Sequence, residues 1–206
     1  MPPQTQYLFA YNVTALISWT CITILAIRHL VSNTTTSDLH PLLQIVTIAQ
    51  TAALLEIAHA AFGLVHASPI ATGLQAGGRN LVLWTVVRRA PEQLLSGVRG
   101  RTAFLACVAA WGVADGLRYA LFAMKGKGKG GAKGRYSAFV VLYPIGFVSE
   151  ATLVYLRLIQ AWETSGPLYT GYLSLGLLAY IPVSYVLYTH MLAQRRRALQ
   201  LKQRVK

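Results

Sequence analysis

Charged residues are scarce in this sequence, and acidic residues are the scarcest. Only 12% of the 206 residues are charged, whereas a soluble domain carries roughly 25%. Six Asp and Glu face 19 Lys and Arg, which gives a formal net charge of +13. Hydrophobic residues make up 54% of the chain. This shortage of charge excludes an ordinary soluble globular domain.

Cysteine is almost absent as well. Cys21 and Cys107 are the two cysteines, and both fall inside apolar runs. Two cysteines placed in this way do not imply the disulfide framework of a small secreted protein. The sequence shows no cluster of His and Cys with metal-ligand spacing, so we expect neither a metal site nor a redox cofactor.

The basic excess raises the question of a nucleic-acid partner. A nucleic-acid-binding module would interleave basic residues with aromatic ones on a soluble surface. Here the Lys and Arg residues lie mostly between or after apolar runs. That placement is typical of the loops of a membrane protein, and we expect no nucleic-acid partner.

What the sequence has in abundance is long apolar segments. Runs of about 20 residues are long enough to cross a hydrocarbon core roughly 30 Å thick. Six such spans are predicted, at 7–27, 41–65, 70–87, 102–124, 137–159 and 168–192. The third is the weakest, because Gln75, Arg79 and Asn80 interrupt it. The sequence predicts an all-α integral membrane bundle of six transmembrane helices, forming a single domain over residues 1–206.

Orientation follows from where the basic residues lie. With six spans both termini are on one side, together with the loop 125–136. That loop and the C-terminal tail hold 5 + 6 = 11 basic residues, against five on the opposite side. The imbalance predicts that both termini are cytosolic, although the arginine-rich segment 88–101 opposes it. The loop serves either as a plain retention signal or as a collar for an anionic ligand.

Ionisable residues inside the spans are costly, by roughly 2.5–3.5 kcal/mol each. They are Glu56, His59, Arg79, Asp115, Arg118, Glu150 and Arg157. Three acids balance three arginines, which indicates a mutually compensating polar interior. Asp115 and Arg118 are three residues apart on one helix face and are expected to form a structural pair.

The segment 139–158 holds the most informative pattern. Seven residues turn a helix through about 700°, so Tyr143 and Glu150 share one face, roughly 10 Å apart along the axis. Pro144 tends to bend the helix, and Gly146 removes side-chain bulk between the phenol and the carboxyl group. Two interpretations remain open from the residues alone. The pair is catalytic, or Tyr143 is a packing aromatic and Glu150 an ion-pair partner of an arginine, Arg79 or Arg118.

Four stretches carry a resemblance to a known family. They are LLEIAHAAFGLVHASPIATGLQAGGRNLVLW from Leu54, AWGVADGLRY from Ala110, RYSAFVVLYPIGFVSE from Arg135 and AYIPVSYVLYTHMLAQRRR from Ala179. They keep their order from about residue 50 to 200 and resemble the very-long-chain (3R)-3-hydroxyacyl-CoA dehydratases, also called protein-tyrosine-phosphatase-like proteins. The element LYPIGFVSE is the most specific of them.

The resemblance implies an enzyme of the endoplasmic reticulum membrane that converts a long-chain (3R)-3-hydroxyacyl-CoA to the trans-2-enoyl-CoA in the fatty acid elongation cycle. It implies no cofactor, a lipid bilayer around the chain, and other enzymes of the cycle as conceivable partners. Tyr143 and Glu150 match the catalytic positions of the family. The positions with supporting or substrate-binding roles are Glu56, Gln75, Arg79, Arg135 and Gly146.

Two departures from the family pattern leave alternatives open. Asp115 stands where the family usually has Glu, and the loop 160–167 is shorter than usual. A family member that has lost activity and serves as a membrane scaffold is one alternative. A small multi-pass transporter, with the intramembrane charges along its pathway, is the other.

Overall fold

The computed structural model of the chain describes residues 2–32, 34–65, 67–124 and 131–203. Side chains are not described for 131–137, 139, 190, 194–195 and 197–203. The described part is helical throughout and contains no strand. Its elements are α1 (Pro3–Val31), α2 (Thr36–Ala52), α3 (Leu55–Ala61), α4 (Pro69–Leu81), η1 (Val82–Val87), α5 (Pro91–Ser96), α6 (Val98–Ala123), α7 (Gly131–Thr164) and α8 (Pro167–Gln203). The all-α fold class is confirmed.

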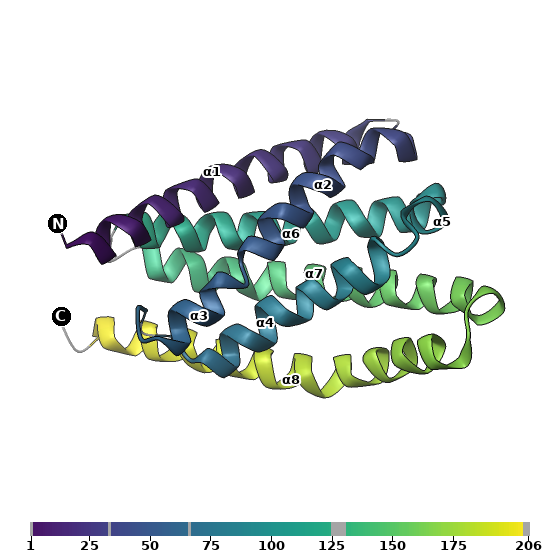
Figure 1. Ribbon diagram of the computed structural model, residues 1–206. Helices are drawn as coiled ribbons and strands as arrows, with labels where there is room; N and C mark the ends of the chain where they lie inside the picture. The colour runs from purple at the N-terminus through teal and green to yellow at the C-terminus, as the bar shows by residue number, and fades with distance from the viewer. Residues whose placement is uncertain (1, 33, 66, 125–130, 204–206) are drawn as a thin grey trace.

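The long helices run along one common direction and form an elongated bundle (Figure 1). Helix α6 lies in the middle and packs against α1 on one side and α7 on the other, while α7 also packs against α8. The two chain termini lie at the same end of the bundle, and the short helix α5 lies at the opposite end (Figure 1). We call these the terminal end and the far end.

Five helical segments are long and apolar enough to cross a membrane: Pro3–Val31, Thr36–Ala61, Val98–Ala123, Val140–Thr164 and Pro167–Ala193. They coincide with five of the six predicted spans, which supports a multi-pass membrane protein. The predicted third span corresponds to α4 and η1 and is not among the five. The count of six spans is therefore not confirmed, and the reason is the polar content of α4, which holds Gln75, Arg79 and Asn80.

Small residues let the central helices approach closely. A Cβ atom on Gly112 of α6 would collide with the hydroxyl of Thr23 and would lie 3.3 Å from the carbonyl oxygen of Trp19, both on α1. Only glycine fits this crossing, as at many contacts between membrane helices. The buried side chains of Trp19 and Trp111 belong to the apolar core that this contact helps to form.

Helix α4 continues directly into a π-helical stretch, η1. Its wider turn is closed at the end by the amide of Arg88, which donates to the carbonyl of Leu83, five residues earlier, at 2.9 Å. Before η1, Asn80 donates to the carbonyl of Gln50 on α2. Within η1, the hydroxyl of Thr85 lies 3.0 Å from that of Tyr172 on α8. The two halves of this segment therefore contact different neighbours.

Candidate active site

Tyr143 is half-buried on α7 and faces α8. Its hydroxyl donates a hydrogen bond of 3.3 Å to the backbone carbonyl of Ser184. Its ring lies against that of Tyr188, with the centroids 5.5 Å apart. The bond to Ser184 is long for an O–H donor, so it is weak and easily exchanged for another acceptor.

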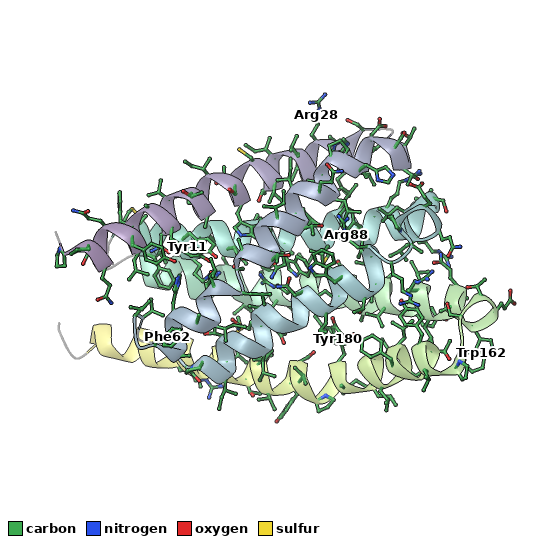
Figure 2. All side chains as sticks on the ribbon, viewed as in Figure 1. Tyr11, Arg28, Phe62, Arg88, Trp162 and Tyr180 are labelled. Atoms are coloured by element: carbon green, nitrogen blue, oxygen red, sulfur yellow. The ribbon has the colours of Figure 1, made fainter. Side chains whose placement is uncertain are left out.

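Glu150 lies between α6 and α8. Its Oε1 accepts a hydrogen bond of 2.6 Å from the indole Nε1 of Trp111, on α6. Its Oε2 accepts one of 2.8 Å from the hydroxyl of Tyr180, on α8. Tyr180 lies about midway along the bundle (Figure 2). Among the described side chains no basic group forms an ion pair with Glu150, whereas Arg79 pairs with Asp115 and Arg118 pairs with Asp115 and Glu56.

Both side chains of the predicted pair are directed toward α8. The groups they contact there, Ser184 and Tyr180, are one helical turn apart. The guanidinium group of Arg79 lies over the ring of Trp111, the side chain that donates to Glu150. The structure thus brings a phenol, a carboxyl group and a guanidinium into one region of the bundle interior.

Four other charged side chains form a continuous chain across three helices. Arg79 of α4 donates to Oδ2 of Asp115 at 2.7 Å, and Asp115 Oδ1 lies 3.1 Å from Arg118 on the same helix. Arg118 in turn donates to both oxygens of Glu56 on α3, at 2.5 and 2.8 Å. The predicted contact between Asp115 and Arg118 is confirmed. The carboxylate of Asp115 also bridges to Arg79, and the hydroxyl of Tyr119 donates to Glu56.

The remaining predicted site residues are distributed less compactly. Gln75 is exposed on α4, away from the carboxyl group of Glu150 in the contacts described. Gly146 is buried on α7, where an added Cβ would lie 3.8 Å from Cβ of Ala110, an ordinary van der Waals separation. The side chain of Arg135 and the segment 125–130 lie outside the described residues.

Sequence reasoning missed the two hydrogen-bond donors to Glu150. Trp111 and Tyr180 both fall within the stretches that carry the family resemblance, AWGVADGLRY and AYIPV. An indole N–H and a phenol O–H inside membrane spans each need an acceptor, and few are available there. The sequence therefore indicates that each of these two donors has an acceptor in the bundle, but it does not identify the acceptor.

Two shallow hollows of about 380 Å³ each lie toward the far end of the bundle. Neither is lined by Tyr143 or Glu150. Among the described residues no group of three or more His, Cys, Asp and Glu side chains is arranged to hold a metal ion.

Comparison with known proteins places the chain in a family. The family described as protein tyrosine phosphatase-like protein, PTPLA, matches residues 50–201. A probable very-long-chain (3R)-3-hydroxyacyl-CoA dehydratase of Schizosaccharomyces pombe is 33% identical over 93% of this chain and 92% of its own length. The dehydratase PASTICCINO 2 of Arabidopsis thaliana is 33% identical over 96% and 95%.

A human relative named very-long-chain (3R)-3-hydroxyacyl-CoA dehydratase 2 is 31% identical over 96% of this chain and 82% of its own length. No solved structure matches the chain. The family match covers well over half of the chain, and these relatives align with nearly all of it. The chain belongs to the protein tyrosine phosphatase-like (PTPLA) family.

Proposed function

We propose that this protein is a very-long-chain (3R)-3-hydroxyacyl-CoA dehydratase that removes water from its substrate by means of Tyr143 and Glu150. Relatives that align along almost the whole chain bear that name. The residues of the proposed pair lie in the bundle interior and are directed toward the same neighbouring helix. The product is the trans-2-enoyl-CoA of the fatty acid elongation cycle.

The reaction needs one base and one acid. The C2–H bond breaks and its proton goes to the base, while the C3–O bond breaks and the hydroxyl leaves as water after gaining a proton. A positioned group of each kind typically contributes about 10²–10⁴-fold in rate. Glu150 takes the C2 proton or returns it to the departing hydroxyl, and Tyr143 donates a hydrogen bond to the leaving oxygen. In a second assignment of roles to the same two residues, Tyr143 polarises the thioester carbonyl.

The observation that carries this proposal is the set of partners around Glu150. Two neutral donors hold its oxygens, and Asp115 rather than Glu150 forms the ion pair with Arg79. A carboxylate locked to an arginine is a poor base, because the proton it accepts displaces a strong ion pair. A carboxylate held by Trp111 and Tyr180 keeps a fixed orientation, and each oxygen retains lone-pair capacity for a proton.

Arg79 has a supporting role in this proposal. It is anchored to Asp115 and also lies over the ring of Trp111, with 5.3 Å from the guanidinium carbon to the ring centroid. From there it stabilises the negative charge that develops on the thioester oxygen as the C2 proton leaves. Glu56 and Arg118 continue the chain of charges and hold Asp115 in place.

The substrate enters from the terminal end. The segment 125–136, of which 131–136 belong to α7, carries five basic residues that suit the phosphates of a CoA headgroup. Tyr143 lies about seven residues, roughly 10 Å along the helix, beyond it. The acyl chain enters between α7 and α8, where the hydroxyl of Tyr143 bonds to Ser184 and Glu150 bonds to Tyr180.

We also propose that α4 with η1 makes the sixth crossing. Both termini lie at one end of the bundle, which requires an even number of crossings (Figure 1). The polar side chains that weaken its hydropathy, Arg79 and Asn80, are engaged with Asp115 and Gln50 inside the bundle. With six crossings, the basic residues of 125–136 and of the C-terminal tail favour cytosolic termini. The membrane in this proposal is that of the endoplasmic reticulum.

The decisive experiment compares variants of purified protein with a long-chain (3R)-3-hydroxyacyl-CoA, monitored for the enoyl-CoA. Tyr143→Phe and Glu150→Gln should each lower kcat by at least about 10²-fold. Tyr155→Phe and Glu163→Gln are matched controls, because both residues are exposed on the same helix. Near-normal turnover by either test variant would refute the catalytic pair, and wild type without turnover would favour the scaffold or the transporter.

A further inference from the structure

Arg157 is a buried cation without a carboxylate partner. It lies on α7 and only 4% of it is exposed. Its Nε donates to the hydroxyl of Tyr169 at 3.3 Å, and Nη1 donates to Oε1 of Gln93 at 2.9 Å. Both partners are neutral. All six acidic residues of the chain are described, and none forms an ion pair with Arg157.

A second arginine approaches the same phenol. The guanidinium carbon of Arg89 lies 4.1 Å from the ring centroid of Tyr169, and that of Arg157 lies 5.6 Å from it. Arg89 is exposed and, among the described residues, also has no carboxylate within 4 Å. The π face of one ring offsets only a small part of two positive charges. This corner of the bundle therefore carries uncompensated positive charge.

One of the two shallow hollows opens at this corner. Its walls are Trp84, Thr85, Arg89, Tyr169 and Tyr172. The hydroxyl of Tyr169 donates to the carbonyl of Thr85, which joins η1 to the start of α8 and holds the aromatic walls in place. Trp and Tyr are the side chains that membrane proteins place at the level of the lipid headgroups. The hollow lies at the far end of the bundle, where the apolar part of α8 begins.

We propose that this hollow binds the phosphate group of an anionic phospholipid in the leaflet at the far end. Arg89 would bind the phosphate directly, since a guanidinium matches phosphate oxygens with two parallel hydrogen bonds. Arg157, behind Tyr169, adds positive charge from the interior. The aromatic walls contact the glycerol and the first carbons of the acyl chains. The proposal does not rest on the dehydratase activity.

A lipid fits the hollow better than free phosphate does. The site is shallow and open to the side, so it would surround only part of a small ion. Its aromatic walls have no role for inorganic phosphate but suit the junction between headgroup and acyl chain. A lipid phosphate would also give Arg89 an anionic partner on the side where the overall charge pattern disfavours basic residues.

The test is a lipid-retention measurement on the full chain. Protein in phosphatidylcholine nanodiscs is titrated with phosphatidylglycerol, and the number of retained lipids is counted by native mass spectrometry. We expect wild type to retain phosphatidylglycerol selectively, and Arg89→Gln to weaken its apparent affinity about tenfold. Arg28→Gln is the matched control, because Arg28 is an exposed arginine in the last turn of α1 and projects away from the bundle (Figure 2).

Arg157→Gln should weaken retention as well, and Arg89→Gln decides the question if the buried variant does not fold. Competition by millimolar inorganic phosphate distinguishes the source of the anion. Displacement of the lipid would support a phosphate site open to solution, and its failure would support a lipid site. Equal retention of phosphatidylglycerol by wild type, Arg89→Gln and Arg28→Gln would overturn the proposal.

Discussion

The indole nitrogen of Trp111 donates a 2.6 Å hydrogen bond to Glu150, and these residues lie on neighbouring helices. The same indole ring lies under the guanidinium group of Arg79. Trp111 thus connects the proposed base to the chain of buried charges without neutralising the base. A positioning role follows, in which Trp111 fixes the direction of the carboxyl group while Arg79 remains bonded to Asp115.

Trp111→Phe should keep most of the packing and remove this donor. A hydrogen bond to a charged group is worth about 1.5–3 kcal/mol, so kcat should fall roughly 10- to 100-fold with a smaller change in KM. Steady-state turnover of the hydroxyacyl-CoA gives both constants. Trp162→Phe is the control, because Trp162 is exposed at the far end of α7. Equal kcat values for wild type and Trp111→Phe would exclude the positioning role.

Tyr180→Phe removes the second donor to Glu150. We expect a kcat loss of the same order, and the double variant with Trp111→Phe should lose less than the product of the two single effects. Groups that share one acceptor are coupled, because after the first loss the carboxyl group is already free to rotate. A double-mutant cycle on kcat measures the coupling. Strict additivity of the two free-energy changes would show that the donors act independently.

Asp115→Asn should destabilise the protein more than any other single change in the charge chain. Asp115 lies between Arg79 and Arg118, and its side chain is only 7% exposed. Removing one partner of a buried ion pair costs about 3–5 kcal/mol, because the other charges stay buried. Thermal unfolding in detergent should show a clear drop for Asp115→Asn. Asp115→Glu keeps the charge and should unfold close to wild type, and a reversed order would argue against this network.

Gly146→Ala tests whether this glycine must leave space near the site. The added methyl group would meet Ala110 at an ordinary separation, so we expect unchanged folding and activity within about twofold. Gly112→Ala is the contrasting variant, because its methyl group would collide with Thr23 on α1. Thermal unfolding and turnover of both variants separate the two cases. A loss of turnover in stable Gly146→Ala would give Gly146 a direct role in substrate binding.

Much of the architecture could be predicted from the sequence, because long apolar runs are a strong signal that depends on length alone. Five runs became candidate spans close to their predicted positions. The segment 70–87 did not, because its polar side chains lower its mean hydropathy. In the fold Arg79 and Asn80 are hydrogen-bonded to Asp115 and Gln50, which a mean hydropathy does not take into account. Helical periodicity also placed Tyr143 and Glu150 on one face, and both are directed toward α8.

The partners of the buried charges could not be predicted in the same way. Spacing on one helix predicted the contact of Asp115 with Arg118, because that contact is local. The bonds from Arg79 to Asp115 and from Arg118 to Glu56 join helices far apart in the sequence. They depend on how the helices are rotated and staggered in the bundle. A single sequence does not specify that arrangement, so it left both Arg79 and Arg118 open as partners of Glu150.

The π-helical stretch η1 sets the direction in which the side chains after it face, relative to those of α4. An α-helix advances about 100° per residue, so one extra residue per turn displaces every later side chain around the axis. Arg79, before η1, faces the charged interior, and Thr85, within it, meets α8. If Val82–Val87 kept its six residues but took the regular α-helical pitch, the Arg79 end would stay in place and the Arg89 end would rotate away from α8. Deleting one residue together with the return to α-helical pitch should largely restore the direction of Arg89, whereas inserting a residue should disturb it.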